Sequence, residues 1–294
     1  MYADSHVHIQ PHGERPQISR ARVDAYVESA RANGVELLAF TEHLFRFTEA
    51  RDTMLGWWDE GADPTLAAHV ERYVDDEISG SVADYVRVIE EAKADGLPVL
   101  LGLEMDWVPG REEELRRFLA PYDWDIILGS VHWIGPWGFD SSSEADQAEW
   151  ARRDIDDVHA GYAELLRDLA ASGLADVLAH PDLPKLFGHR PSSWTPLHDA
   201  IIEAARGGNC AVEINTNGWN KPVAEAYPAP PVLERASALG LPVTLASDAH
   251  RPEHVGRDFD RAVALARDAG YESYLSFQSR RRQARSLVPA EAGR

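Results

Sequence analysis

Residues 4–8 read Asp4-Ser5-His6-Val7-His8 and place two histidines, two positions apart, at the end of a short strand-like run. Side chains at positions i and i+2 of a β-strand point to the same side, so His6 and His8 can present two imidazoles to one ion. Ligand-type residues also follow short apolar runs at Thr41-Glu42-His43, Gly102-Leu103-Glu104, Gly129-Ser130-Val131-His132, Ala179-His180-Pro181 and Ser247-Asp248-Ala249-His250. Histidines and carboxylates gathered at the C-terminal ends of strands are what a multinuclear metal site in an α/β barrel requires.

Short β-branched or leucine-rich runs alternate along the chain with amphipathic stretches of helical period. Candidate strands end near His6, Thr41, Leu103, Ser130, Ala179, Asn215 and Ala246, and candidate helices cover Val23–Asn33, Val82–Asp95, Glu112–Leu119, Ile155–Ala171, Leu197–Arg206, Val232–Leu239 and Phe259–Asp268. Because parallel strands need crossover helices, this alternation predicts a parallel α/β fold. An open, flavodoxin-like sheet is the alternative. Only a closed barrel brings together ligands from nearly every strand, and we therefore predict a barrel.

Composition and charge predict an acidic enzyme of one domain spanning residues 1–294. The chain is 44% hydrophobic and carries 29 basic against 49 acidic residues, a net charge of −20. Such a surface repels phosphodiester backbones, so a nucleic-acid partner is not expected. Cys210 is the only cysteine, which leaves nitrogen and oxygen as metal ligands. We recognise neither a signal peptide nor an apolar run of ~20 residues, and predict a cytoplasmic protein without a membrane partner. The oligomeric state is not predicted, and a homo-oligomer stays open.

Three segments depart from the alternation of strands and helices. Leu44–Ser81 and Trp133–Trp150 are long and rich in aromatic residues. Long loops at the C-terminal face of a barrel usually build the substrate pocket, although these aromatic residues could equally pack on the barrel rim. The last segment, Ser279–Arg294, contains Arg280-Arg281-Arg282 and little apolar pattern, so we expect a solvated, loosely ordered tail.

Several longer motifs resemble those of one protein family. They are Gly129-Ser130-Val131-His132-Trp133, His180-Pro181-Asp182-Leu183-Pro184-Lys185, Phe187-Gly188-His189-Arg190, Glu213-Ile214-Asn215-Thr216-Asn217-Gly218 and Tyr227-Pro228-Ala229-Pro230. With the strand-end residues from Asp4 to Pro252, they make nearly the whole chain similar to the PHP (polymerase and histidinol phosphatase) superfamily, and within it to the monofunctional histidinol-phosphate phosphatases. The resemblance implies a distorted TIM-like (β/α)7 barrel of the PHP type. It also implies three divalent metal ions, which could be zinc, iron or manganese.

The ligands of the family correspond to residues of this chain. The resemblance implies a first ion on His6, His8, Glu104 and Asp248, a second on Glu104, His132 and His180, and a third on His43, His250 and a residue after the first strand. We assign that last position to His12, although the segment His8–His12 is shorter than the family spacing. The alternative for His12 is a loop histidine near the pocket mouth.

The activity that the resemblance implies is hydrolysis of L-histidinol phosphate to L-histidinol and phosphate in histidine biosynthesis. We expect a hydroxide held between two ions to attack phosphorus, with Glu104, Asp248 and His250 as the catalytic residues. Phosphate contacts are expected from Arg153, and further candidates are Lys185, His189 and Arg190. The expected partner is a small phosphorylated substrate.

Other activities of the superfamily remain as alternatives. They are phosphoesterases that act on a nucleotide or oligonucleotide phosphate or on phosphotyrosine, and a binding module that has lost its metals. An acidic, aromatic pocket would suit the ammonium and imidazole of histidinol phosphate. Residues beside the metal motifs that could supply such a pocket are Glu42, Asp106, Trp107 and Trp133.

Overall fold

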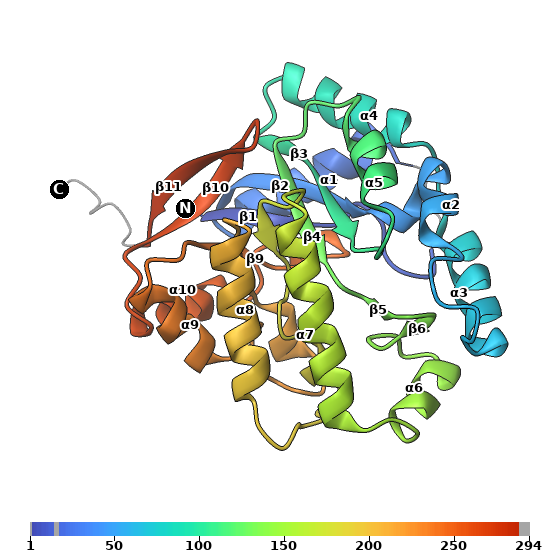
Figure 1. The fold of residues 1–294 in the computed structure, drawn as a ribbon. Helices are drawn as coiled ribbons and strands as arrows, with labels where there is room; N and C mark the ends of the chain where they lie inside the picture. The colour runs from blue at the N-terminus through green and yellow to red at the C-terminus, as the bar shows by residue number, and fades with distance from the viewer. Residues whose placement is uncertain (1, 15–17, 288–294) are drawn as a thin grey trace.

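The structure, a computed structural model, describes residues 2–14 and 18–287. It contains a seven-stranded parallel sheet in the order β1-β2-β3-β4-β7-β8-β9. The strands are β1 (Tyr2–Val7), β2 (Val35–His43), β3 (Val99–Asp106), β4 (Ile126–Ser130), β7 (Val177–Leu178), β8 (Ala211–Asn215) and β9 (Val243–Ala246). The sheet curls into a nearly closed barrel, and helices surround it (Figure 1). The predicted parallel barrel is therefore confirmed.

Each helix predicted from the apolar pattern forms, and three further helices lie in the two long segments that were predicted as loops. They are α1 (Arg20–Ala32), α2 (Arg51–Met54), α3 (Pro64–Glu77), α4 (Val82–Ala94), α5 (Glu112–Leu119), α6 (Glu144–Trp150), α7 (Ile155–Ala171), α8 (Thr195–Gly207), α9 (Pro230–Ala238) and α10 (Phe259–Asp268). In α7, Val158, Tyr162 and Leu166 recur every four residues and are buried against the barrel. The helix begins after Asp154, whose carboxylate accepts from the backbone N–H groups of the first turn. Within the described ranges, no helix is long and apolar enough to cross a membrane.

The barrel closes between its first and last strands through few backbone contacts. The His8 N–H donates to the Ala249 carbonyl at 2.8 Å, and Val7 forms an isolated parallel bridge with Ala249. The buried Asp4 carboxylate supports this seam, accepting from the Ser247 N–H at 2.9 Å and from the Ser247 hydroxyl at 2.5 Å. Burial raises the pKa of Asp4 to about 6, although these hydrogen bonds oppose the shift. A side chain therefore completes the closure where the ladder between strands is interrupted.

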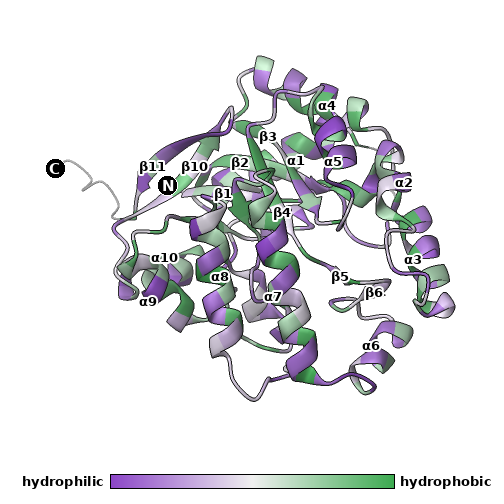
Figure 2. Cartoon of the chain, viewed as in Figure 1, coloured by the Kyte–Doolittle hydropathy of each residue, from purple (hydrophilic) through white to green (hydrophobic). Residues whose placement is uncertain are grey.

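A hairpin of β10 (Ser273–Gln278) and β11 (Arg281–Ser286) covers the end of the barrel at which the parallel strands begin. Phe277 of β10 is buried in an apolar cluster with Ala39, Leu100, Ile126, Leu128, Val177, Ala179 and Ala211. In Figure 2 the central strands are largely green and β11 is purple. This arrangement corrects the prediction of a loosely ordered tail, because residues 281–286 are a strand; residues 288–294 lie outside the described residues.

Arginine side chains explain why so polar a segment is ordered. The Arg280 guanidinium donates to Asp176 at 2.9 Å and to the Leu174 carbonyl at 2.6 Å. Arg285 donates to Glu36 at 2.7 Å. These acceptors lie on the rim of the barrel, far away in sequence, so the arginine run has a structural function that its composition did not reveal.

The two long segments predicted as loops are partly helical and lie at the C-terminal end of the barrel. Leu44–Ser81 contains α2 and α3, and Trp133–Trp150 contains the short hairpin of β5 (Trp133–Ile134) and β6 (Trp137–Gly138) followed by α6. Phe45 is 2% exposed and stacks on His43 with ring centroids 4.5 Å apart. The Trp133 ring meets Phe45 edge-on at 5.5 Å. The aromatic residues thus form an apolar wall beside the strand-end histidines.

Candidate metal centre

Histidines and carboxylates converge at the C-terminal ends of the barrel strands. Four sets of three side chains have ligand atoms within 4.8 Å of one another: His6–His8–Asp248, His6–Glu104–His180, His8–His43–His250 and His43–Asp106–His132. Two of these residues, His180 and Asp248, have positive φ angles of 27° and 51°. Non-glycine residues rarely adopt such angles, and where they do the backbone is often aiming a functional side chain.

Glu104 of β3 lies at the centre of the cluster, and its two oxygens face different histidines. Oε1 is 2.9 Å from His180 Nε2 and 3.4 Å from His132 Nε2. Oε2 is 3.4 Å from His6 Nε2 and 3.5 Å from His8 Nε2. A carboxylate placed in this way can contribute one oxygen to each of two ions.

The group of side chains around Glu104 Oε2 comes from both sides of the junction between β1 and β9. The Nε2 atoms of His6 and His8 are 2.9 Å apart, and Asp248 Oδ1 is 3.8 Å and 3.5 Å from them. His6 and His8 belong to the end of β1 and Asp248 follows β9, so closing the barrel is what assembles this group.

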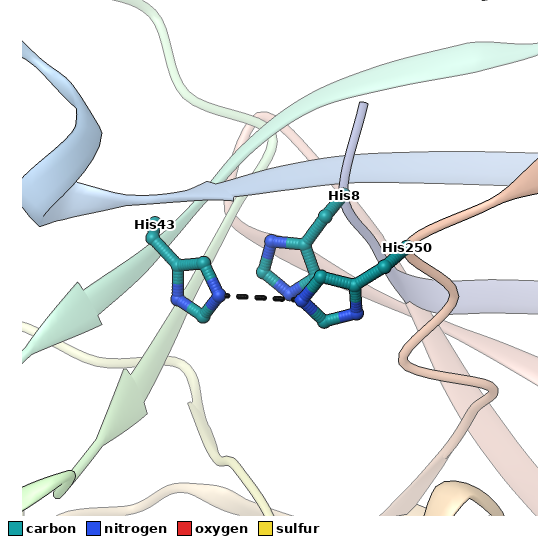
Figure 3. A group of neighbouring side chains, drawn as sticks. All are labelled: His8, His43 and His250. Carbon is teal, nitrogen blue, oxygen red and sulfur yellow. Dashed lines mark hydrogen bonds between the residues drawn. The ribbon is translucent and has the colours of Figure 1, made fainter. Parts of the chain in front are cut away.

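His43 and His250 form a separate pair, shown with His8 in Figure 3. Their Nε2 atoms are 3.4 Å apart, and the rings are inclined by 41°. Two ligands about 2.1 Å from a tetrahedral zinc ion are about 3.4 Å apart, so this pair could share an ion. The His8 ring instead stacks on both, inclined by 19° to His43 and 25° to His250. Nearly parallel, stacked rings cannot direct their in-plane lone pairs to one point, which places His8 with His6.

Buried carboxylates fix the tautomers of three of these histidines. Nδ1 of His6 is 2.7 Å from Glu213, Nδ1 of His8 is 3.3 Å from Glu42, and Nδ1 of His132 is 2.6 Å from Asp106. A carboxylate accepts the Nδ1–H, which leaves the Nε2 lone pair available to a metal, as in carboxylate–histidine–metal arrangements. The Nε2 atoms of His6 and His8 then lie 2.9 Å apart, a spacing that either a shared proton or a bound cation can bridge. The residues therefore fit a metal cluster.

The electrostatics of the site also suit metal ligands. Burial opposes ionisation of Glu104, but His43, His6 and His132 outweigh it and hold the pKa of Glu104 well below its usual range. Burial and the neighbouring His8 lower the pKa of both His43 and His250. Burial lowers the pKa of His132, but Glu104, Asp140 and Asp106 raise it to about 10. The rise in the pKa of His132 reflects the negative charge of these three carboxylates, which a divalent ion would neutralise.

Two acids predicted to line a substrate pocket lie behind the histidines instead. Glu42 and Asp106 are 0% exposed, and each faces an imidazole Nδ1. Trp107 is 3% exposed and belongs to the apolar core. These three side chains shape and support the site, whereas Trp133, whose ring lies edge-on to His132 at 5.7 Å, borders it.

Lys185 has a different role from the predicted phosphate contact. Its ammonium group is 2.8 Å from Asp182, 2.7 Å from Glu225 and 2.7 Å from the Ala226 carbonyl. An ammonium has three donors, and these three acceptors occupy them. Lys185 is also 2% exposed, so it joins two loops rather than meeting a ligand.

The other predicted phosphate-binding residues lie on the segments around α6 and the loop before α8. Arg153 donates to Glu149 at 3.2 Å and lies over the Trp137 ring at 4.4 Å. Its Nε is buried without a hydrogen-bond partner among the described residues, and its contact with a phosphate group stays a prediction. His189 stacks on Trp150 at 4.2 Å, and Arg190 is exposed.

His12 lies beside the cluster but belongs to none of the four sets. Its side chain is 48% exposed, and its ring stacks on His250 with centroids 4.5 Å apart. Its role as a ligand, like the assignment of the other residues to particular ions, stays a prediction.

Two residues of the site had not been assigned a role from the sequence. Glu213 of β8 accepts from the His180 N–H at 2.7 Å as well as facing His6, and the buried Arg46 is 3.0 Å from Glu77 and 3.5 Å from Glu42. Glu213 occupies the same strand-end position as the predicted ligands, within a motif that had been recognised, and this position was a usable signal. No local pattern distinguishes Arg46 from a surface arginine.

Comparisons with known proteins agree with this geometry. The model of the PHP domain matches residues 4–217. A probable histidinol-phosphatase of Deinococcus radiodurans is 36% identical over 281 residues, which cover 95% of this chain and 98% of that protein. A histidinol-phosphatase of Lactococcus lactis is 23% identical, with 93% of each chain covered.

Two solved structures share the fold. The crystal structure of histidinol phosphate phosphatase from Lactococcus lactis, complexed with zinc, L-histidinol and phosphate, superposes with a TM-score of 0.71 at 20% identity, covering 96% of this chain and 98% of that one. A histidinol phosphatase structure from Listeria monocytogenes gives a TM-score of 0.68 at 21% identity, covering 88% and 99%. From its domain match and its similarity to curated relatives over nearly the full length, the chain belongs to the PHP domain family.

Proposed function

We propose that this protein is a metal-dependent phosphomonoesterase that hydrolyses L-histidinol phosphate to L-histidinol and phosphate. The observation that carries the proposal is the position of Glu104, whose two oxygens face two different groups of histidines within a buried cluster. The full-length similarity to a probable histidinol-phosphatase supports the choice of substrate.

The proposal includes three divalent ions, of zinc, iron or manganese. His6, His8, Asp248 and one oxygen of Glu104 would hold the first, the other oxygen of Glu104 with His132 and His180 would hold the second, and His43 and His250 would hold the third. Bound ions of this kind lower the pKa of water and neutralise charge on phosphoryl oxygens. The described residues include only one cysteine, the buried Cys210, in keeping with ligands of nitrogen and oxygen and with the predicted cytoplasmic location.

The residues of the chain have distinct tasks in this reaction. Glu213, Glu42 and Asp106 hold protons on Nδ1 of three histidines and thereby keep their Nε2 atoms available. The apolar wall of Phe45 and Trp133 excludes water from one side of the cluster. Arg153 would donate to the phosphate group through the N–H groups of its guanidinium.

Hydrolysis of three phosphate esters tests the proposal. Metal-loaded protein and chelator-treated protein are assayed against histidinol phosphate, a dinucleotide and a phosphotyrosine peptide. We expect turnover of histidinol phosphate only, and only with metal. Preferential cleavage of the dinucleotide or of the peptide would assign the chain to a different phosphoesterase activity, and full activity after chelation would remove the metal centre from the mechanism.

A further inference from the structure

The two oxygens of the Asp248 carboxylate have different neighbours. Oδ1 faces the histidines and is 3.8 Å from His6 Nε2 and 3.5 Å from His8 Nε2. Oδ2 instead accepts from two side-chain amides, at 3.3 Å from Asn215 Nδ2 and 3.2 Å from Asn217 Nδ2. Because the amides occupy Oδ2, Oδ1 is the oxygen that this carboxylate can offer to an ion.

The backbone alone does not hold Asp248 in this position. Its φ angle is 51°, in the left-handed region that residues other than glycine rarely adopt. It also lies beyond the end of β9, which finishes at Ala246, and so outside the ladder between the strands. Contacts made by the side chain must therefore keep the carboxylate directed at the histidines.

The amide of Asn217 is itself oriented by Arg257. Nη2 of Arg257 donates to Asn217 Oδ1 at 3.0 Å. A guanidinium has only donors and a carboxylate has only acceptors, so the amide between them has its oxygen toward Arg257 and its nitrogen toward Asp248. The reverse orientation would place oxygen against a carboxylate and an NH₂ group against a cation. Arg257 thus selects the orientation in which Asn217 donates to Asp248.

Arg257 is tied through its backbone to the loop that carries the two amides. The hydroxyl of Thr216 donates to the Arg257 carbonyl at 2.7 Å. Within the loop, the Asn217 N–H donates to Asn215 Oδ1 at 2.9 Å, and both Asn215 and Thr216 are 0% exposed. The loop after β8 and the segment before α10 are therefore joined through both a backbone carbonyl and a side chain of Arg257.

Two neighbouring residues have similar chemistry but do not reach a candidate ligand. Asn220, in the same loop, donates to Asp258 at 3.1 Å, and Asp258 is exposed and belongs to none of the four ligand sets. The guanidinium of Arg261 lies over the Trp219 ring at 4.0 Å. Asn220 and Arg261 are therefore matched controls for Asn217 and Arg257.

We propose that Arg257 is a positioning residue for the metal centre, which acts through Asn217 to hold Asp248 Oδ1 toward the first ion. Without the guanidinium the amide can turn, and the carboxylate is then free to move away from the histidines. The affinity for the ion falls because one ligand is no longer held in place before binding. This inference rests on the metal centre of the proposed function and not on the identity of the ester.

Competition with a chromophoric chelator measures the zinc affinity of each variant. Arg257→Ala and Asn217→Ala should each weaken zinc binding about tenfold, which is typical for partners of metal ligands. Arg257→Lys should recover part of the loss, because its ammonium can also donate to the amide. Arg261→Ala and Asn220→Ala should keep the wild-type affinity. Equal zinc affinities in Arg257→Ala and the wild type would refute the positioning role.

The double variant Arg257→Ala/Asn217→Ala tests whether the arginine acts through the amide. Its zinc affinity should be close to that of Asn217→Ala alone, because the guanidinium then has no amide to orient. Independent effects would instead multiply to a loss of about a hundredfold, and that result would overturn the proposed connection.

Phosphate binding separates positioning from a direct contact with the substrate. Calorimetry with inorganic phosphate is carried out on zinc-saturated protein, in which Arg257→Ala should keep the wild-type affinity for phosphate. Weaker phosphate binding together with unchanged zinc affinity would make Arg257 a phosphate contact and overturn the proposal. If the zinc affinities change as expected but the wild type does not hydrolyse histidinol phosphate, only the proposed substrate is refuted.

Discussion

The two ends of the barrel bury ionisable groups in opposite ways. At the end covered by the hairpin, Asp125 accepts from Lys93 at 2.7 Å and from the Ser279 N–H at 2.9 Å, and Asp176 accepts from Arg280 at 2.9 Å. At the other end, the carboxylates of Glu104 and Asp248 face imidazoles. Lysine and arginine neutralise a carboxylate permanently, whereas imidazoles leave the charge to a metal ion. One end is electrostatically complete as folded, whereas the other is arranged to bind a cation.

The strongest test of this comparison replaces one acid at each end. Glu104→Gln should lower kcat more than about 1000-fold, because loss of even a single donor to transition-state charge can cost that much, and it should weaken two ion sites together. Asp125→Asn should leave the metal content unchanged. Turnover assays and elemental analysis check both variants, and a fully metallated, active Glu104→Gln would show that this carboxylate does not bridge.

The apolar nature of the hairpin end predicts a large effect on stability alone. Phe277→Ala should lower the free energy of unfolding by about 3–5 kcal/mol, because it removes a buried ring from a closed cluster. Urea unfolding measures the change, and Leu239→Ala, at a residue that is 54% exposed, serves as the control with little effect. If Phe277→Ala instead depleted metal from the folded protein, the two ends would not be independent.

Residues that hold the histidines should matter for metal affinity. Glu213→Gln keeps the shape of the side chain but weakens the acceptor at His6 Nδ1 and at the His180 N–H, so the affinity for zinc should fall about 10- to 100-fold. Glu36→Gln, which removes a comparable charge at the hairpin end, is the matched control. Competition with a chromophoric chelator measures both affinities, and equal values would exclude a positioning role for Glu213.

Metal binding at the histidine end should release protons. The pKa of His132 is raised to about 10 in the metal-free protein, so its imidazole carries a proton at pH 8 that must leave before Nε2 can bind. Zinc affinity should therefore rise by up to about tenfold per pH unit from pH 7 toward pH 10. Calorimetry in buffers of different ionisation enthalpy counts the protons. A heat that does not depend on the buffer would contradict this sign.

The smallest expected effect concerns the predicted phosphate contact. Arg153→Ala should raise KM for the phosphate ester about fivefold and leave the metal content intact, because its guanidinium, on a side chain that is 33% exposed, contributes about 1 kcal/mol. Arg152→Ala, at the neighbouring and more exposed arginine, is the control for net charge. Steady-state kinetics separate KM from kcat. Metal loss in Arg153→Ala would mean that this residue supports the α6 segment instead.

The sequence predicted the barrel and the strand-end cluster because both follow from local patterns. Ile155–Ala171 and Phe259–Asp268 form helices with the predicted bounds, since their apolar residues recur with a regular helical spacing. The metal motifs were recognisable because each follows a strand. The helix Pro64–Glu77 was not predicted, although Asp63 caps it and Leu66, Val70 and Val74 are buried, because it lies in a segment whose aromatic residues are equally compatible with a pocket loop.

Other features depend on contacts between distant residues and were not predictable from local pattern. Arg280 pairs with Asp176, 104 residues away, and Lys185 pairs with Glu225, 40 residues away. Neither the order of the hairpin nor the ion pairing of Lys185 could therefore be inferred from the adjacent sequence. The partners of the imidazole Nδ1 atoms are equally remote, since His6 and Glu213 are 207 residues apart. The tautomers of the histidines and the pairing of charges depend on the folded chain, whereas the periodicity of strands and helices is visible in short stretches of sequence.

The seam between β1 and β9 has a consequence for how the protein is made. Asp4 and Ser247, which close it, are 243 residues apart, and the candidate ligands His6 and Asp248 lie beside them on opposite sides. During synthesis, the histidines at the end of β1 can acquire these partners only after β9 and the residues that follow it have been translated. A ribosome-bound chain would therefore offer incoming cations only a fragment of the site, and metal acquisition becomes one of the final events of maturation.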